Sequence, residues 1–368
     1  MRGCGDRLAT HVRLRRKSAF AFSMHRSLRT SFLSAAACAL LPLLAGAQTA
    51  TTTQTTADTG EANPGQAELV REVAAATGKN PAELNALLDG AVMKQGIIDA
   101  MNRPAESKPW SAYRPIFMNP ERIDEGLVFY RQHRALLDQI GKQYGVPPQY
   151  IVAIIGVETN YGAITGSYRV LDALVTLGFH YPPRASYFRG ELKTLLELPA
   201  NKLPGPIPDI YGSYAGAEGL AQFMPSSIRD FAVDADGDGR INLNASLPDA
   251  FASIANYFRA HGWQAGQPVA VQAEPSTNAA PPPDYENALP QTPLEQFTAD
   301  GYAPTAHADP ALPANLLTLD GAGGPEYWLT FQNFYVITRY NKSPMYALAV
   351  TQLADAIMRG VAKAPDAQ

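Results

Sequence analysis

Hydrophobic positions recur with a helical period along most of the chain. Apolar residues spaced three and four apart predict amphipathic helices. The expected helical ranges are 68–76, 81–90, 92–101, 120–144, 171–177, 184–198, 219–233, 249–261 and 344–360. Asn80 and Asn119 each precede a proline and are expected to cap helices, because asparagine caps an N-terminus and proline fits the first helical position. The range 120–144 is expected to be one continuous helix that ends at Gly145.

The stretch 264–325 breaks this pattern. It is rich in proline and alanine, and it contains short β-like pieces such as residues 269–271. This composition favours a small β insertion with long loops. The aromatic residues of 335–346, together with Asn341, could stack on a sugar and hydrogen-bond to it, but taken alone this segment favours a strand core followed by a helix cap. The chain is therefore predicted to be mainly α with a small β part, an α+β fold.

The first 47 residues have the pattern of an export signal. Residues 24–29 are short and basic, residues 32–45 are apolar, and residues 45–47 have the small-x-small pattern of a cleavage site. This pattern is typical of a secretory signal peptide over residues 1–47 rather than of a membrane span. The unusually long basic segment before Met24 suggests that translation starts at Met24. Residues 48–66 are expected to be a disordered linker.

Cysteine content and charge narrow the class of protein. Both cysteines, Cys4 and Cys38, lie in the predicted leader, so the mature chain would hold no disulfide. Cys38 lies inside the apolar run, and we do not expect it to carry a lipid anchor. The leader holds eight of the 30 Lys and Arg and one of the 34 Asp and Glu, which leaves a net charge of −11 on the remainder. An acidic exported chain is not expected to bind nucleic acid.

Glu158 is the most informative single residue. It follows seven residues, 151–157, that carry no polar side chain. A carboxyl group against an apolar wall has a raised pKa, and such a glutamate can donate a proton to a leaving oxygen, as glycoside cleavage requires. The alternative for this helix alone is a solvent-facing glutamate at a helix end.

Two further segments carry candidate chemistry. Residues 212–227 are rich in small residues, and Ser213 and Gln222 offer hydrogen bonds to sugar hydroxyls or amides; a glycine-rich helix entry would explain the same segment. Residues 234–242 place Asp234, Asp236 and Asp238 at positions one, three and five of an EF-hand-like loop, with glycine at position six. Position twelve is not acidic, so the closing ligand is expected from Asp249. The sequence thus predicts a structural Ca²⁺ site and no organic cofactor.

Together these motifs closely resemble the membrane-bound lytic murein transglycosylase B family over residues 67–362. The resemblance implies a lysozyme-like core with a helical domain and a small β domain. It assigns 67–145 to the helical domain, 146–263 to the catalytic core with a calcium loop over 234–249, 264–330 to the β domain, and 331–363 to a return to the core with a closing helix. It also implies cleavage of the β-1,4 bond between N-acetylmuramic acid and N-acetylglucosamine in peptidoglycan without water, which leaves 1,6-anhydromuramoyl ends.

The resemblance also implies residue roles. Glu158 would be the single catalytic acid and base. The residues that match substrate-binding positions of the family are Tyr113, Arg184, Ser213, Gln222, Phe223, Tyr257, Tyr340, Asn341 and Tyr346. The residues that match the calcium site are Asp234, Asp236, Asp238, Asp249 and Arg240, the last through its carbonyl. The expected protein is a monomer in the periplasm that acts on peptidoglycan glycan strands.

Two positions depart from the family pattern. Pro183 stands where a second arginine is expected, and Glu218 stands where the family usually has methionine. Glu218 could bring a second carboxylate near the cleft and raise the pKa of Glu158 further. It therefore keeps open a muramidase that uses water on the same fold. Pro183 motivates a third hypothesis, a peptidoglycan-binding protein without catalysis, against which the intact Glu158 argues.

Overall fold

The structure, a computed structural model, describes residues 64–103 and 108–363. The predicted leader over 1–47, Cys38 and nearly all of the predicted linker over 48–66 lie outside the described residues. In the described ranges, no helix is both long enough and apolar enough to cross a lipid bilayer. The first described helix begins at Pro64, slightly before the expected start at 68.

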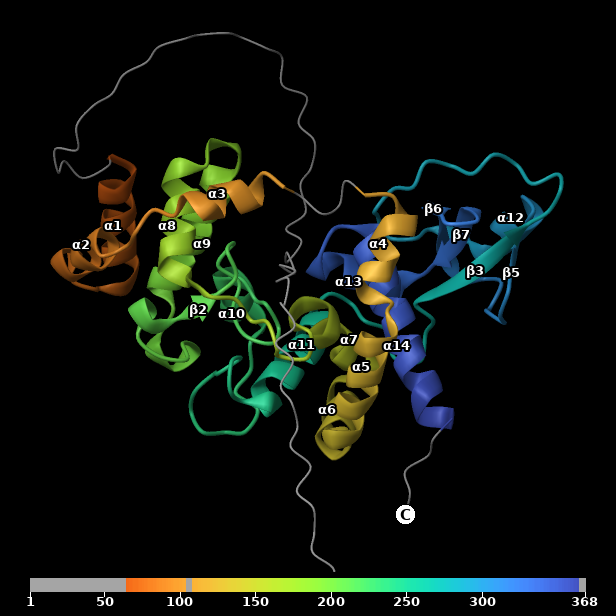
Figure 1. Ribbon diagram of the computed structural model, residues 1–368, viewed down its shortest axis with the longest axis horizontal. Coiled ribbons are helices and arrows are strands. Elements are labelled where there is room, and N and C mark those ends of the chain that lie inside the picture. The colour runs from red at the N-terminus through yellow and green to blue at the C-terminus, as the bar shows by residue number, and fades with distance from the viewer. Residues whose placement is uncertain (1–63, 104–107, 364–368) are drawn as a thin grey trace, which may run out of the picture. The chain divides into compact units, whose positions relative to one another are not determined.

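Helices dominate the described chain (Figure 1). In chain order they are α1 (Pro64–Thr77), α2 (Pro81–Asp89), α3 (Gln95–Met101), α4 (Trp110–Phe117), α5 (Pro120–Gln132), α6 (Arg134–Tyr144), α7 (Pro148–Thr159), α8 (Val170–His180), α9 (Ala185–Glu197), α10 (Pro225–Phe231), α11 (Leu247–Ala260), α12 (Leu294–Ala299), α13 (Gln332–Tyr340) and α14 (Pro344–Lys363). Both predicted asparagine caps are present: the side chain of Asn80 accepts from the backbone N–H of Ala82, and that of Asn119 from Arg122.

Three expectations about helices were wrong. Residues 120–144 form two helices rather than one, because His133 leaves the helical conformation with φ −112°. The break lets α6 pack against α11 while α5 packs against α14. Residues 219–224 form a loop rather than the first turns of a helix, since Gly219 and Gln222 have positive φ values of 69° and 48°. Residues 335–340 belong to α13 rather than to a strand.

The core is built around α7. This helix is apolar on all sides, and every residue from Ile151 to Val157 is buried. Helices α5, α6, α11 and α14 all contact α7. Burial of each large aliphatic side chain contributes about 1.5–3 kcal/mol, so α7 is a main source of stability. Its last turn therefore holds Glu158 in a rigid setting.

The β structure consists of a five-stranded antiparallel sheet in the order β4-β6-β7-β3-β5. The strands are β3 (Ala270–Pro275), β4 (Thr292–Pro293), β5 (Tyr302–Pro304), β6 (Pro313–Gly321) and β7 (Gly324–Thr330). A second hydrophobic cluster, which includes Phe297, Leu316 and Leu329, packs on this sheet. The sheet confirms a small β part in an otherwise helical protein, and the domain boundaries themselves remain predictions.

A short strand pair joins two segments that lie far apart in the sequence. Strands β1 (Tyr168–Arg169) and β2 (Tyr211–Gly212) pair in antiparallel register. Arg169 also binds the carboxylate of Asp172 at 2.6 Å. Asp172 accepts from the backbone N–H of Val92, which ties the α2–α3 connection to α8. Gly212 lies against Gly166, in the segment that follows α7.

Candidate active site

Glu158 lies in the last turn of α7, immediately before a strained turn. Asn160 and Tyr161 both have positive φ, 49° and 58°, a conformation that non-glycine residues adopt only when the surroundings enforce it. The enforcing contact is the side chain of Tyr161, whose hydroxyl donates to the carbonyl of Arg122 at 2.8 Å. A Cβ at Gly156 would lie 2.6 Å from that hydroxyl, so only glycine fits there. The turn thereby sets the direction of the chain after Glu158.

The carboxyl group of Glu158 accepts a hydrogen bond from the hydroxyl of Tyr346, at 2.5 Å. Protein atoms surround the carboxyl closely, while part of the residue stays accessible to solvent. Burial raises the pKa of Glu158 to about 7, and the hydrogen bond from Tyr346 opposes this rise. At neutral pH the group can therefore both give and accept a proton.

Tyrosine side chains form one wall of this site. Burial and the nearby Glu158 carboxylate raise the pKa of both Tyr340 and Tyr346 well above its ordinary value, so both phenols stay neutral. The Tyr340 hydroxyl donates to the carbonyl of Ala221 at 2.6 Å. Tyr113, fully buried in α4, acts electrostatically on Tyr346. Three of the tyrosines predicted from the sequence, Tyr113, Tyr340 and Tyr346, therefore lie in one group with Glu158.

Phe223 and Tyr257 extend this group. The ring of Phe223 lies 5.8 Å from that of Tyr340 and 5.7 Å from that of Tyr257. Tyr257 and Tyr340 lie 4.8 Å apart between ring centroids, and the Tyr257 hydroxyl donates to the carbonyl of Arg339 at 2.5 Å. Aromatic pairs at such distances contribute beyond their buried area. The motif over 212–227 and the motif over 335–346 thus meet beside Glu158.

Ser213 and Gln222 hold the loop that carries Phe223. The Ser213 hydroxyl accepts from the backbone N–H of Ala217 at 3.0 Å. The Gln222 side-chain amide donates to the carbonyls of Thr165 and Gly219 at 3.1 and 2.9 Å. The bond to Thr165 joins this loop to the turn that follows Glu158.

Asn341 and Arg184 have different settings. Asn341 is buried, and its side-chain oxygen accepts from the backbone N–H of Ser343 just before α14, which is the helix of Tyr346. The guanidinium of Arg184 lies over the rings of Tyr187 and Phe188, 4.6 and 5.0 Å from their centroids. None of the described contacts of Arg184 reaches the group around Glu158.

Glu218 is a buried carboxyl without a described partner for one oxygen. The residue is 1% exposed, and its Oε1 atom has no hydrogen-bond partner among the described residues. Burial raises the pKa of Glu218 to about 8. The backbone of Glu218 pairs with both Gly212 and Phe223. The groups that shift the pKa of Glu158 are burial and Tyr346, so the expected influence of Glu218 on Glu158 is not found.

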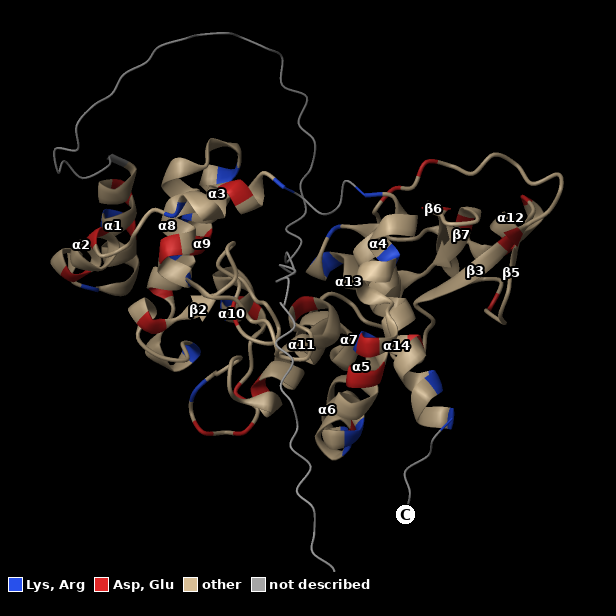
Figure 2. Ribbon diagram, viewed as in Figure 1, with Lys and Arg blue, Asp and Glu red and all other residues tan. Residues whose placement is uncertain are grey.

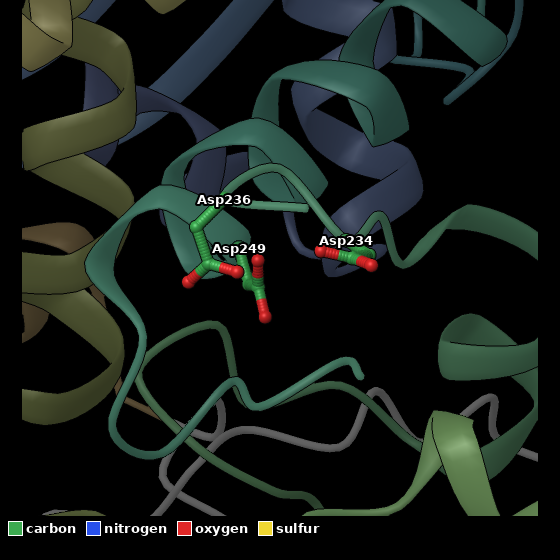
Figure 3. A group of neighbouring side chains, drawn as sticks. All are labelled: Asp234, Asp236 and Asp249. Atoms are coloured by element: carbon green, nitrogen blue, oxygen red, sulfur yellow. The ribbon is translucent and has the colours of Figure 1, made fainter. Parts of the chain in front are cut away.

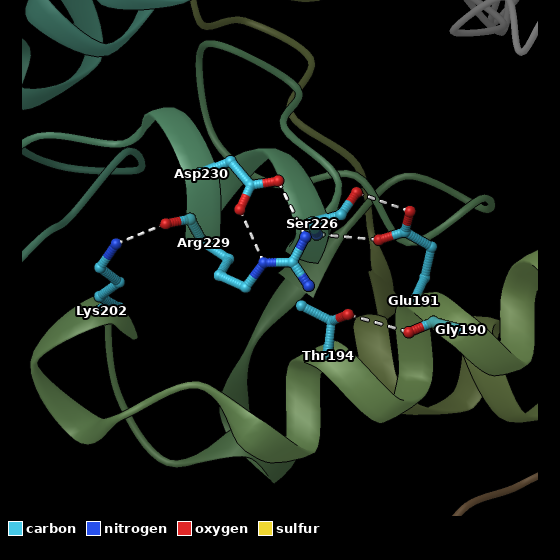
Figure 4. A network of polar contacts seen from close by, with 7 residues as sticks. All are labelled: Gly190, Glu191, Thr194, Lys202, Ser226, Arg229 and Asp230. Atoms are coloured by element: carbon cyan, nitrogen blue, oxygen red, sulfur yellow. Dashed lines mark hydrogen bonds and ion pairs between the residues drawn. The ribbon is translucent and has the colours of Figure 1, made fainter.

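The sequence analysis did not predict the side-chain contacts that hold α10, the helix that follows the loop of Phe223. The buried carboxylate of Glu191 in α9 accepts from the backbone N–H and the hydroxyl of Ser226 at 2.9 and 2.7 Å (Figure 4). A carboxylate at the start of α10 also complements the helix dipole. At the other end of α10, Lys202 donates to the carbonyl of Arg229 at 2.6 Å. The apolar period of α9 gave no sign that Glu191 faces inward, because its partner lies 35 residues away.

The calcium loop gathers part of its predicted ligand set. Carboxylate oxygens of Asp234, Asp236 and Asp249 lie within 4.8 Å of one another (Figure 3). Asp249, at the start of α11, is 1% exposed and accepts from the backbone N–H groups of Ala235 and Asn242, both at 2.8 Å. Asp238 is not part of this group; it accepts from the backbone N–H of Arg240 at 2.8 Å.

Comparison with known proteins places the chain. Residues 61–355 match the family described as "Transglycosylase SLT domain". The chain is 40% identical over 305 residues to membrane-bound lytic murein transglycosylase B of Escherichia coli (strain K12), which covers 80% of this chain and 83% of that protein.

Solved structures agree with this match. The structure of the Escherichia coli lytic transglycosylase Slt35 in complex with calcium is 39% identical, with a TM-score of 0.73, and covers 81% of this chain and 94% of that one. The structure of SltB3 from Pseudomonas aeruginosa in complex with NAG-NAM-pentapeptide is 30% identical, with a TM-score of 0.69, and covers 79% and 78%. The lysozyme-like fold and the predicted family are thereby confirmed. This chain belongs to the transglycosylase SLT domain family, and its enzymatic class is that of the lytic transglycosylases.

Proposed function

We propose that this enzyme cleaves the β-1,4 bond between N-acetylmuramic acid and N-acetylglucosamine in peptidoglycan with Glu158 as its single acid and base. The observation that carries the proposal is the setting of Glu158. Its carboxyl ends a buried apolar helix, accepts one hydrogen bond from Tyr346, and has a pKa of about 7. A carboxyl with that pKa suits both halves of a proton relay at neutral pH.

The reaction then runs in two proton transfers. The protonated Glu158 gives its proton to the glycosidic oxygen, and the bond from that oxygen to the anomeric carbon of the muramoyl sugar breaks. The resulting carboxylate takes the proton of the muramoyl 6-hydroxyl, and that oxygen attacks the anomeric carbon. The proton lost in the first transfer is regained in the second, so no water is consumed. The products are a free N-acetylglucosamine hydroxyl and a 1,6-anhydromuramoyl end.

The absence of an interacting second carboxylate supports this route over hydrolysis. Two-carboxylate glycosidases hold their acids about 5–10 Å apart across the sugar. Among the described residues, no carboxylate acts on the pKa of Glu158, and Glu218 is sealed from solvent with its backbone fixed in two bridges. The muramidase hypothesis therefore loses the feature that supported it.

The surrounding aromatic and amide groups suit a glycan strand. Tyr340 is half-buried beside Glu158 and can contact a sugar, while the buried rings of Phe223 and Tyr257 pack against it and hold it in place. We include Ser213, Gln222, Asn341 and Tyr113 in the binding region as supports of its shape. Arg184 would contact the substrate at its periphery. The relative that was solved with NAG-NAM-pentapeptide suggests that the strand carries its peptides when bound.

Mass spectrometry of the cleavage products tests the reaction. Purified sacculi are treated with residues 48–368, the chain without its predicted leader, and the soluble fragments are weighed. Muramoyl ends one water lighter than hydrolysed ends are expected. Hydrated reducing ends would instead establish a muramidase, and no soluble fragments at all would favour a binding protein.

Tyr346→Phe should move the pH dependence of cleavage. The hydrogen bond from Tyr346 lowers the pKa of Glu158, so its removal raises that pKa further above 7. Because the first step needs the protonated acid, the alkaline limb of the rate profile should shift to higher pH, with a rate loss of about tenfold or less. The control is Tyr302→Phe in the sheet. An unchanged or acid-shifted profile for Tyr346→Phe would contradict the assignment.

We also propose a structural calcium ion in the loop over 234–249. Three carboxylates converge there, and no described salt bridge neutralises them. Hard oxygen donors of this kind fit Ca²⁺, and the relative Slt35 was solved with calcium. Asp234, Asp236 and Asp249 would hold the ion through their side chains, with Asp238 and the Arg240 carbonyl completing the set when the loop adjusts.

Calcium should raise the melting temperature of the enzyme. An ion that binds only the folded state at about one hundred times its Kd stabilises by about 2.7 kcal/mol, which corresponds to several degrees. Thermal unfolding in calcium and in chelator measures the difference. Asp234→Asn should lose most of the response, while the exposed Asp320→Asn should keep it. Equal melting temperatures in calcium and chelator would remove the metal site.

Export to the periplasm, without a lipid at Cys38, is proposed from the leader alone. The substrate supports this location, since peptidoglycan lies outside the cytoplasmic membrane. We also propose that the enzyme acts as a monomer.

A further inference from the structure

A pocket of about 600 Å³ lies apart from the group around Glu158. Helices α4 and α14, together with β7 and the turn before it, supply most of its lining. Figure 1 labels these helices and this strand. Its chemical groups are Arg114, Glu326, Trp328, Gln352, Asp355 and Arg359. A volume of this size is typical of sites for small ligands. No lining residue belongs to the binding region proposed above.

The distance between the pocket and the catalytic group can be estimated along α14, which contributes residues to both. Tyr346, the partner of Glu158, lies in the first turn of this helix, whereas Gln352 and Arg359 lie further along it. At about 1.5 Å per residue, they lie about 9 and 20 Å from Tyr346 along the helix axis. The pocket is therefore displaced along α14 from the catalytic group, although Arg114 in its lining directly follows Tyr113 of that group in α4.

Neutral partners, rather than opposite charges, orient the charged groups of the pocket. The Nε atom of Arg114 donates to the side-chain oxygen of Gln352 at 2.6 Å. One oxygen of Glu326 accepts from the indole N–H groups of Trp110 and Trp328, at 3.1 and 3.3 Å. These hydrogen bonds orient the guanidinium of Arg114 and the carboxylate of Glu326. Because the partners are neutral, neither charge is neutralised.

Charges of both signs thus share one pocket without neutralising each other. In the described part of the chain, no salt bridge joins Arg114 or Arg359 to Glu326 or Asp355. Arg359 attracts Asp355 only at longer range. Arg114 and Glu326 are held by neutral partners, and the exposed side chains of Asp355 and Arg359 add a further charge of each sign. Groups of both signs in one pocket match a ligand that itself carries a carboxylate and an ammonium group.

We propose that this pocket binds the peptide part of peptidoglycan, a short peptide with free carboxylate and ammonium groups. The guanidinium groups of Arg114 and Arg359 would take a carboxylate, and Glu326 and Asp355 the ammonium group. Gln272 and Gln352 are placed to pair with the peptide backbone, and Trp328 packs on it. Because the pocket lies apart from Glu158, the peptide would come from a neighbouring strand. The enzyme would thus hold one strand of the wall while it cleaves another, an inference that rests on the proposed function.

Nuclear magnetic resonance of the indole N–H groups tests the proposal. The chain has three tryptophans, and two of them donate to Glu326. The probe is the synthetic pentapeptide N-acetyl-L-Ala-γ-D-Glu-L-Lys-D-Ala-D-Ala, with its lysine ammonium and its carboxylates free and its N-terminus an amide as in peptidoglycan, added to the ¹⁵N-labelled protein at low salt. The signals of Trp110 and Trp328 should shift, and that of Trp263 should not. The same peptide with its lysine amine acetylated and its carboxyls amidated should bind at least about tenfold more weakly, since charge-assisted hydrogen bonds are lost.

Variants connect the shifts to the pocket. Arg114→Gln and, separately, Arg359→Gln should each weaken binding of the free peptide, by about tenfold for Arg114. Arg71→Gln, an exposed position on α1, is the matched control and should bind like the unchanged protein. Melting temperatures show that each variant is folded. Equal affinity of the free and blocked peptides, or of Arg114→Gln, Arg359→Gln and Arg71→Gln, would overturn the proposal, as would shifts confined to Trp263.

Cleavage of sacculi by the unchanged protein separates this inference from the proposed function. If anhydromuramoyl ends form and the free peptide leaves Trp110 and Trp328 unshifted, only the pocket assignment fails. If no anhydromuramoyl ends form, the proposed function fails whatever the peptide does. Glu158→Gln should bind the peptide with unchanged affinity, because Glu158 does not line the pocket.

Discussion

Glu158→Gln should abolish cleavage of peptidoglycan while binding to sacculi persists. Glutamine keeps the shape of the side chain and can still meet the hydroxyl of Tyr346, which donates to Glu158 at 2.5 Å. It cannot give a proton to the glycosidic oxygen or take one from the 6-hydroxyl. Positioned acid–base catalysis contributes about 10²–10⁴-fold, and one residue that serves both steps should fall at the upper end of this range. The release of soluble fragments measures the rate.

The comparison needs a matched carboxylate elsewhere. Glu83→Gln on the exposed face of α2 removes one negative charge far from the site and should leave the rate unchanged. Co-sedimentation with sacculi shows that Glu158→Gln still binds. A residual rate within tenfold of the unchanged enzyme would remove Glu158 from its assigned role.

Glu218→Met should stabilise the enzyme, most of all at alkaline pH. The carboxyl of Glu218 is 1% exposed, one of its oxygens lacks a partner among the described residues, and burial raises its pKa to about 8. Methionine is similar in size and has no charge to desolvate. With an unfolded pKa of 4.5 against about 8 in the folded state, the penalty of burying this acid reaches roughly 3–5 kcal/mol above pH 8.

The sign of the pH effect follows from proton binding. Between pH 4.5 and about 8 the folded chain keeps the proton on Glu218 and the unfolded chain loses it. The folded state then binds more protons, so the free energy of unfolding falls as pH rises through this window. Glu158, with its pKa raised to about 7, adds a decrease of the same sign over a narrower window that ends near pH 7. Glu218→Met should remove the larger of these two contributions.

Thermal unfolding at pH 5, 7 and 9 measures this effect. The melting temperature of Glu218→Met should exceed that of the unchanged protein by the largest margin at pH 9. Glu218→Gln separates charge from shape, and Glu83→Gln is the surface control. Identical pH slopes for Glu218→Met and the unchanged protein would contradict the buried neutral acid. Cleavage by Glu218→Gln with anhydromuramoyl products would also show that this carboxyl takes no part in the chemistry.

Local signals predicted much of the fold. The apolar run before Glu158 and the caps at Asn80 and Asn119 depend on neighbours within a few residues, and the structure has each of them. The break at His133 was not predictable in this way, because it serves the separate packing of α5 and α6. Helix α4 was also missed, since Pro115 lies inside it and interrupts the apolar period.

In the candidate site, too, features set by nearby residues were predictable and contacts between distant segments were not. The residue types in the motifs pointed to Glu158, Tyr340 and Tyr346, which the structure brings together. Two other contacts could not be predicted from a local pattern. Glu191 binds Ser226, and the side chain of Tyr161 packs against Gly156. The roles of all these residues remain predictions until the variants are measured. For α13, the β-branched and aromatic residues favoured a strand, and packing against α14 decided for a helix.

The hydroxyl that binds Glu158 belongs to a residue 188 positions later in the chain. Ribosomes add about 5–20 residues per second, so Tyr346 is made roughly 10–40 s after Glu158. During that interval the growing chain holds the proposed acid without the helix α14 that completes its surroundings. An unfinished or C-terminally shortened chain should therefore leave the cell wall intact, and the enzyme would become hazardous to its maker only once synthesis has ended.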